Sequence, residues 1–357
     1  MFVALRDLRF ARGRFILIGS VVALITILVG FLSGLTGGLA AQNVSAVLAI
    51  PADRLVFSAP DPGAGGSVSF SDSAITARQA QAWAATSGVT SASPIGISQT
   101  RAEAGSRRVA VAVFGVEPGF DATSPTQSGA LALSAPAAQQ LDATTGDEVT
   151  IAGQTYRVES VGGDGWYSHT PVVSMTLHDW QTMSAATGSP DAYATVLAVG
   201  GAADWTAAAA RTKTVAQSPL ASLTAIGAFK SEIGSLLMMV AMLFGISALV
   251  IGAFFTVWTL QRKGDVAVLK ALGASTRSLV VDALGQAFVV LLVGIGIGIG
   301  VVSLLGAVTG GALPFLLSPL TTVLPGVIMI ALGLAGAAIA LRSVTSADPL
   351  TALGSNR

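Results

Sequence analysis

Residues 232–276 read EIGSLLMMVAMLFGISALVIGAFFTVWTLQRKGDVAVLKALGAST, a long apolar run followed by a short charged segment. A helix rises 1.5 Å per residue, and about 20 apolar residues are needed to cross a bilayer. The run up to Leu260 is therefore long enough to span a membrane. The segment after it carries Asp265 and Lys270, so we expect that segment to lie in water at the membrane surface.

The composition of the whole chain agrees with a membrane protein. Of 357 residues, 52% are hydrophobic and only 11% are charged, and the mean hydropathy is +0.72. The formal net charge is +0 and no tract of Lys and Arg occurs, so nucleic acid is not expected as a partner. The chain has no cysteine, which excludes disulfides, thiolate nucleophiles and Cys-ligated metals.

The hydropathy pattern predicts an α-helical membrane protein with four transmembrane helices. Arg and Lys precede the first apolar run and lie between the second and third, which places these flanks and both termini in the cytoplasm. The predicted segments are a cytoplasmic amphipathic segment (1–14), spans at 15–40, 231–260, 279–307 and 322–342, an outer domain (41–230), a cytoplasmic coupling segment (261–278), an outer loop (308–321) and a cytoplasmic tail (343–357).

Residues 41–230 alternate strand-like and helix-like runs, which predicts a large mixed α/β extracellular domain of two lobes. Residues 53–59 and 107–116 have the β-branched alternation of strands, and EAGSR at 103–107 is typical of a hairpin turn. Residues 76–88, TARQAQAWAATSG, begin with a capping Thr and close with Gly, so they predict a helix. Residues 133–162 predict a short helix followed by two strands.

The charged segment also has an apolar stripe. Val268, Leu272 and Leu279 fall on one face of a helix, which favours a short amphipathic helix that docks on another protein. A helix resting on lipid headgroups is the alternative.

Several stretches resemble one family, the MacB/FtsX-type (type VII) ABC transporter permeases. The family motif E-x-A-x-L-[RK]-A-x-G-A-[ST] is matched at Asp265, Ala267, Leu269, Lys270, Ala271, Gly273, Ala274 and Ser275, with Asp265 in place of the usual Glu. LSAPAAQQLDATTGDEVTI (133–151) and ADPLTAL (347–353) resemble the family's outer-domain unit and its C-terminal motif. Within the family, LRDLRFARGRF (5–15) is most similar to the haem-exporting permeases of Gram-positive bacteria.

The resemblance implies a permease of the bacterial plasma membrane that pairs with a second copy of itself and with two copies of a separate ABC ATPase. ATP is then bound by the partner subunit, since no G-x-x-x-x-G-K-[ST] loop occurs here. The resemblance assigns the contact with the ATPase to Asp265, Lys270, Ala271, Gly273 and Ala274. A helix over 229–262 would be about 50 Å long against a hydrocarbon core of about 30 Å, which suits mechanical coupling across the membrane.

Glu232 is the acidic residue at the start of the second span, where an ionisable group must face a polar cavity or find a partner. Ser235, Met239 and Met242 follow it on one helical face. Carboxylate oxygen and thioether sulfur are both plausible ligands for haem iron, so this stripe is the predicted substrate site, with Glu232 as iron ligand and haem as the expected substrate. Ordinary packing of the methionines and solvation of Glu232 are the alternatives.

Gly34 and Gly38 lie on the first span and permit close approach of another helix. We expect packing there, with a wall of the substrate cavity as the alternative.

Other functions have less support. His169 and His178 are the only histidines, and neither H-E-x-x-H nor G-x-S-x-G accompanies them, so we expect surface histidines, no intrinsic cofactor and no enzyme activity. An FtsX-like signalling permease, which activates an extracellular partner without transport, remains the alternative. Export of a peptide or macrolide, or release of lipoproteins, is also compatible with the architecture.

Overall fold

The computed structural model describes residues 12–60, 66–261, 264, 268, 270, 272–309 and 313–345. The chain forms two compact units, which we call the helical unit and the α/β unit. The helical unit contains the residues up to Gly38 and those from Ser235 onward, and the α/β unit is Leu39–Gly234. The predicted N-terminal amphipathic segment lies almost entirely outside the described residues, and so does the C-terminal ADPLTAL motif.

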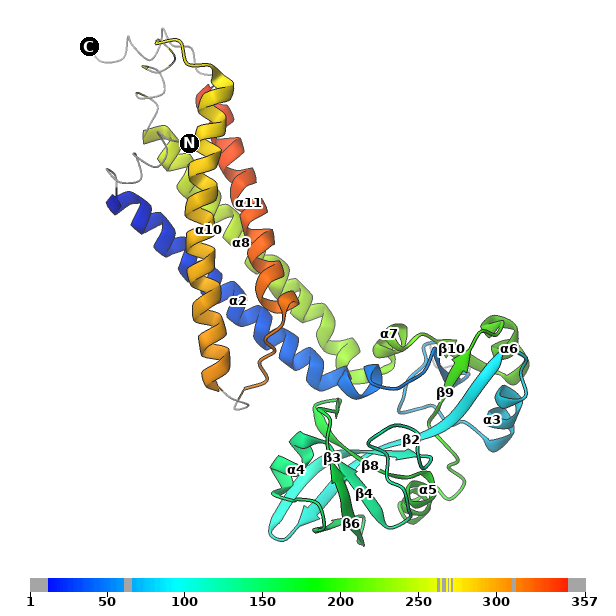
Figure 1. Cartoon of the computed structure of the whole chain (residues 1–357). Coiled ribbons are helices and arrows are strands. Elements are labelled where there is room, and N and C mark those ends of the chain that lie inside the picture. Colours follow the sequence, from blue (N-terminus) through cyan, green and yellow to red (C-terminus); the bar gives the residue numbers. More distant parts are fainter. Residues whose placement is uncertain are drawn as a thin grey trace. The chain divides into compact units, whose positions relative to one another are not determined.

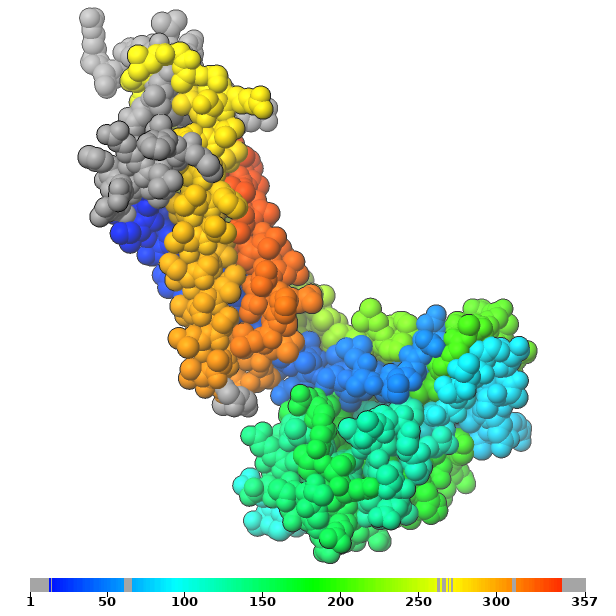
Figure 2. Space-filling view, in the orientation of Figure 1, coloured from blue at the N-terminus to red at the C-terminus, as the bar shows by residue number. Residues whose placement is uncertain are grey.

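Four helices of the described chain are long and apolar enough to cross a membrane. They are α2 (Arg12–Leu48), α8 (Gly227–Gln261), α10 (Thr276–Thr309) and α11 (Pro319–Thr345). Within the helical unit α10 and α11 run side by side (Figures 1 and 2). Buried apolar side chains such as Val22, Phe255 and Leu291 form the core between the helices.

All four helices extend past the predicted spans, and α2 does so by the most residues. Helix α2 runs eight residues beyond position 40 and ends at Leu48, shortly before Pro51. A proline disfavours helical geometry in the residue before it, which explains why the helix stops there. The last residues of α2 and the first residues of α8 belong to the α/β unit.

The α/β unit is built on one sheet, ordered β10-β1-β9-β2-β3-β8-β4-β6-β5, with β7 paired to β8. Its strands are β1 (Arg54–Ser58), β2 (Val89–Ala104), β3 (Arg107–Val116), β4 (Ala130–Leu133), β5 (Glu148–Ile151), β6 (Gln154–Val161), β7 (Trp166–Tyr167), β8 (Thr170–Thr176), β9 (Val196–Gly201) and β10 (Thr214–Gln217). Its helices are α3 (Ala77–Ala84), α4 (Ala135–Leu141), α5 (Leu177–Ala186), α6 (Trp205–Thr212) and α7 (Pro219–Ser222), with a 3₁₀ turn at Leu223–Ala225 before α8.

Strand β2 is 16 residues long and serves both predicted lobes. Val89–Ile95 pair with β9, and Gly96–Ala104 pair with β3. Helices α3 and α6 cover the lobe of β10, β1 and β9, while α4 and α5 cover the lobe of β3, β8, β4 and β6 (Figure 1). The mixed α/β domain between the first and second spans is therefore confirmed.

Local signals account for the elements that the sequence predicted. Thr76 caps α3 in a capping box with Gln79, and Ser134 caps α4 by accepting a hydrogen bond from the Ala137 N–H. Gly105 has φ +56° in the tight turn between β2 and β3, a backbone conformation that glycine adopts without steric cost.

The end of α2 is part of the hydrophobic core of the α/β unit. Val44 and Val47 are buried in one cluster with Phe57, Phe114 and Tyr167. The Tyr167 ring packs edge-on against Phe114 with centroids 5.8 Å apart, and burial raises the pKa of its phenol. Tyr167 therefore fixes the β7–β8 hairpin against α2.

Candidate functional site

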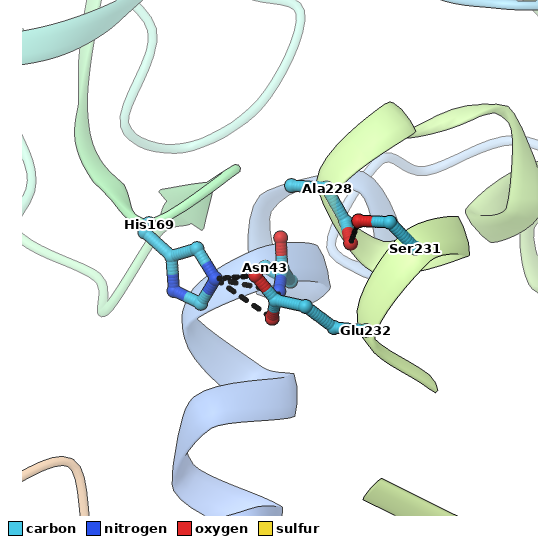
Figure 3. A network of polar contacts seen from close by, with 5 residues as sticks. All are labelled: Asn43, His169, Ala228, Ser231 and Glu232. Atoms are coloured by element: carbon cyan, nitrogen blue, oxygen red, sulfur yellow. Dashed lines mark hydrogen bonds and ion pairs between the residues drawn. The ribbon is translucent and has the colours of Figure 1, made fainter. Parts of the chain in front are cut away.

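Three polar side chains from distant parts of the sequence meet within the α/β unit (Figure 3). Asn43 comes from α2, His169 from the turn between β7 and β8, and Glu232 from the first turns of α8. The Glu232 Oε2 atom lies 3.0 Å from Asn43 Nδ2 and 3.0 Å from His169 Nε2. His169 Nε2 is also 3.1 Å from Glu232 Oε1 and 2.9 Å from Asn43 Nδ2. We call these three residues the polar triad.

An unusual turn presents His169 to the other two residues. Ser168 and His169 are the central pair of a two-residue hairpin, with φ values of +48° and +63°. Positive φ at both positions is typical of type I′ turns, in which Asn-Gly is preferred, so side chains larger than glycine are strained there. The N–H groups of Ser168 and His169 donate to the carbonyls of Asn43 (3.0 Å) and Gln42 (2.9 Å), which offsets that strain.

A third contact fastens the same hairpin to α2. The Trp166 N–H donates to Ser45 Oγ at 2.9 Å. The position of the His169 ring is therefore fixed by backbone hydrogen bonds to one helix and by the burial of Tyr167.

Burial differs within the polar triad. Asn43 is 1% exposed, whereas the side chains of His169 and Glu232 are 30% and 40% exposed. Among the described residues, Asn43 Oδ1 is one of two buried side-chain oxygens without a hydrogen-bond partner. The triad thus combines a buried amide with an imidazole and a carboxylate that water can reach.

The sequence predicted that Glu232 would need a polar partner, and the structure provides two. The expectation that His169 is a surface histidine is wrong, because the hairpin turn carries it into half-buried contact with Glu232. His178 is exposed, as expected. No group of three or more His, Cys, Asp or Glu side chains is close enough to hold a metal in the described part of the chain.

The other residues of the predicted substrate stripe lie on α8 in the helical unit. Ser235, Met239 and Met242 follow Glu232 by three, seven and ten positions on one unbroken helix. Met239 and Met242 are 48% and 62% exposed in the single chain. All four residues belong to α8, and both their common face and their contact with a substrate stay a prediction.

Gly34 and Gly38 pack against the segment between α10 and α11. A Cβ atom at Gly34 would lie 2.3 Å from the Phe315 ring, and one at Gly38 would lie 1.8 Å from the Pro314 carbonyl oxygen. Leu316 donates its N–H to the Gly34 carbonyl at 3.0 Å. Close packing explains both glycines in the single chain, and a role in a substrate cavity stays a prediction.

The structure describes part of the predicted coupling segment, including Val268, Lys270 and the residues from Leu272 to the start of α10 at Thr276. The Leu272 N–H donates to the Val268 carbonyl at 3.0 Å, and Gly273 follows with φ +94°. Ser275 then caps α10 by accepting a hydrogen bond from the Ser278 N–H at 3.2 Å. Lys270, Gly273 and Ala274 are described, whereas Asp265 and Ala271 lie outside the described residues.

Two carboxylates with a lowered pKa lie outside the polar triad, Glu159 in β6 and Asp147 directly before β5. The side-chain and backbone donors of Thr126 lower the pKa of Glu159, and the backbone and side-chain donors of Thr144 lower that of Asp147. Both carboxylates accept hydrogen bonds from threonines in neighbouring loops and so hold those loops in place, and we assign them no functional role.

Comparison with known proteins shows which protein families this chain is similar to. Residues 246–349 match the family model described as FtsX-like permease C-terminal. The chain is 26% identical over 223 residues to a protein named hemin transport system permease protein HrtB from Staphylococcus haemolyticus, covering 60% of each chain. A protein of the same name from Staphylococcus epidermidis is 30% identical over 129 residues, which cover 36% of this chain and 37% of the relative.

Mycobacterial relatives match over nearly the full length. An uncharacterized ABC transporter permease of Mycobacterium tuberculosis is 26% identical over 373 residues, covering 99% of each chain. Among solved structures, the extracellular domain of the transporter YknZ from Gram-positive bacteria aligns with a TM-score of 0.32 and 12% identity, over 48% of this chain and 91% of that one. The periplasmic region of MacB from Actinobacillus actinomycetemcomitans aligns with a TM-score of 0.35 and 10% identity, over 46% and 88%.

Proposed function

We propose that this chain, an ABC transporter permease of the FtsX/MacB type, exports haem or a similar amphipathic compound from the plasma membrane. The relatives named as hemin transport permeases support this substrate class. The structural observation that carries the proposal is the Glu232 carboxylate, followed on the same face of α8 by exposed Met239 and Met242.

The chemistry of these side chains suits haem. A carboxylate oxygen is a good ligand for ferric iron, and a thioether is a known axial ligand of haem. The flexible methionine side chains can also cover an apolar ring of irregular outline. In this proposal Glu232 binds the iron of the substrate, and Ser235, Met239 and Met242 contact the macrocycle.

A second copy of the chain would complete the proposed site. Only 11% of the apolar window of α8 is buried within the single chain, compared with 33% for each of the other three candidate spans. An apolar face this open suits a contact with another protein. A two-fold axis along α8 would bring two Glu232 stripes face to face.

The energy for export would come from a separate ATPase, two copies of which would bind the permease dimer on the cytoplasmic side. We assign the contact to the turn around Lys270, Gly273 and Ala274, together with Asp265 and Ala271. Val268 and Leu272 are 56% and 79% exposed in the single chain, which leaves apolar surface for such a partner. Helix α8 is continuous from Glu232 to Gln261. In this proposal, a displacement of the turn by the ATPase shifts α8 and thereby changes the substrate site at its other end.

We expect Glu232→Ala to weaken haem binding about tenfold or more, because removal of one iron ligand costs at least about 1.4 kcal/mol of binding free energy. Met239→Ala should weaken it several-fold. The measurement is haem titration of the full-length protein in nanodiscs, followed by the Soret band. Leu237→Ala is the control, because Leu237 is 61% exposed and lies five positions after Glu232, on a different face of the same helix. Wild-type protein that gives no saturable Soret change would contradict the proposal.

We expect Gly273→Val to abolish the haem-stimulated part of the ATPase rate while haem binding stays unchanged. Gly273 has φ +94°, where a β-branched residue is strongly strained, so the turn would have to rearrange. The rate is measured on the permease reconstituted with its ATPase. Gly264→Ala is the control, because a Cβ there meets no other atom within 4 Å. Equal stimulation in both variants would argue against a coupling role for the turn.

One observation favours a second candidate function, that of an FtsX-like signalling permease. Val44 and Val47 of α2 are part of the α/β core, and Phe229 of α8 packs against it, so movement of either helix would be transmitted to that unit. Co-purification of an extracellular hydrolase, together with an ATPase rate that haem does not stimulate, would favour this reading over export.

A further inference from the structure

The α/β unit contains a cavity that the proposed transport site does not use. It has a volume of about 330 Å³ and lies between the end of α2, the sheet and the loops at 120–123 and 162–165. This volume is at the lower end of the range for pockets that hold small organic ligands. The residues of the polar triad and of α8 do not line it, so it is separate from the proposed substrate stripe.

Small residues create this cavity. Ala46 and Ala49 at the end of α2, Ala132 in β4 and the glycines of the loop at 162–165 all line it. Protein interiors are close-packed, so a cavity of this size within a folded unit is uncommon. An apolar ligand would remove the walls of the cavity from water, which is a favourable change.

The floor of the cavity is apolar. Ile95, Phe114 and Val172 line it, and all three belong to the buried cluster that also contains the end of α2. The hydroxyls of Ser45 and Ser134 are also at the wall, but each accepts a hydrogen bond from a backbone N–H of the chain. The floor therefore suits a hydrocarbon chain or ring.

Two carboxylates lie at the opening of the cavity. Asp121 and Asp164 both line it and are both exposed. Asp121 Oδ1 accepts hydrogen bonds from the Thr123 N–H and from Ser124 Oγ, which fixes the loop that carries it. Among the described residues, no Lys, Arg or His lines the cavity, and neither carboxylate forms an ion pair.

The α/β unit as a whole has an excess of negative charge. Residues 39–234 contain nine Arg and Lys residues and fifteen Asp and Glu residues. Such a charge distribution attracts cations and repels anions. Haem carries two carboxylate groups, so the opening of this cavity disfavours haem and favours a positively charged ligand.

We propose that this cavity binds a small organic cation that consists of an ammonium group attached to an apolar chain or ring. The apolar part would lie between Ala49, Phe114 and Val172, and the ammonium group would lie beside Asp121 and Asp164. A bound ligand would contact both the end of α2 and the sheet, and would therefore hold them together. The site is additional to the proposed transport site and does not depend on it.

The test is isothermal titration calorimetry of the full-length protein in nanodiscs, with phenylbutylamine as the probe. Phenylbutanol and phenylbutyrate are the neutral and anionic controls, and empty nanodiscs measure partition into lipid. We expect a saturable heat for the amine that empty nanodiscs do not give. The alcohol should bind about tenfold more weakly, because it lacks two exposed charge contacts, and the carboxylate should not bind.

Asp121→Asn and Asp164→Asn each remove one charge and keep the shape of the side chain. We expect each to weaken binding of the amine about threefold, the usual effect of one exposed charge contact. Asp191→Asn is the matched control, because Asp191 is exposed in the same unit and does not line this cavity. Ala49→Phe should abolish binding of both the amine and the alcohol, because it fills the cavity from an exposed position.

The inference is overturned if the amine gives no saturable heat beyond that of empty nanodiscs, or if phenylbutyrate binds as tightly as the amine. It is also overturned if Asp191→Asn weakens binding as much as Asp121→Asn and Asp164→Asn do, since the amine would then respond only to the charge of the unit. These titrations contain no haem. A failed Soret titration would contradict the haem assignment alone, and a failed amine titration would contradict this cavity alone.

Discussion

Replacing Trp83 by alanine is expected to lower the free energy of unfolding of the α/β unit by about 3–5 kcal/mol. Trp83 is fully buried between α3 and the sheet, in a cluster with Val56, Leu197 and Val199. Its indole N–H donates to Thr214 Oγ1 at 3.1 Å. The substitution would remove a large apolar side chain, leave a cavity and take a hydrogen-bond donor away from Thr214.

The measurement is proteolytic susceptibility of the full-length protein in rising urea. Trp205→Ala is the matched control, because Trp205 stacks on Trp83 with centroids 6.3 Å apart but is partly exposed. We expect that control to lose about 1 kcal/mol, within the usual range for a single aromatic contact. If the two variants lost equal stability, Trp83 would not be central to the core.

Replacing Gly38 by valine is expected to destabilise the helical unit by about 3 kcal/mol or more, the upper range for overpacking. A Cβ at this position would lie 1.8 Å from the carbonyl oxygen and 2.3 Å from the carbonyl carbon of Pro314. These are backbone atoms, so no side-chain rotation relieves the overlap. The segment before α11 would have to separate from α2, and the contact of Phe315 with Gly34 would be lost with it.

Thermal unfolding of the purified protein in nanodiscs measures this effect. Gly300→Val, in α10, is the control, because a Cβ there meets no other atom within 4 Å. Both variants add the same β-branched residue to an apolar helix, so their difference isolates the overlap with Pro314. Equal melting temperatures would mean that the segment at Pro314 is free to move away.

Local patterns in the sequence were sufficient to predict much of the fold. The four apolar runs predicted the long helices, and the capping residue Thr76 predicted where a short helix begins. Gly105 marked the hairpin turn between β2 and β3. Each of these signals depends on residues within a few positions of one another, which is why a single sequence reveals them.

The polar triad could be predicted only in part. The position of Glu232 indicated that it needs a partner, but His169 lies 63 residues away and reaches it through a turn with positive φ at Ser168 and His169. No local pattern predicts such a turn without glycine. The available signal was Asn43, a polar residue just beyond the end of the first predicted span. The helix α2 continues through this position to Leu48.

Strand β2 limits how the α/β unit could be recombined with its relatives. Its first half is hydrogen-bonded to β9 in one lobe, and its second half, from Gly96 onward, is bonded to β3 in the other. The two lobes are thus not separable modules, although each has its own helices. A chimera that takes one lobe from another permease must inherit all of β2 with it, and a junction at Gly96 would interrupt both ladders at once.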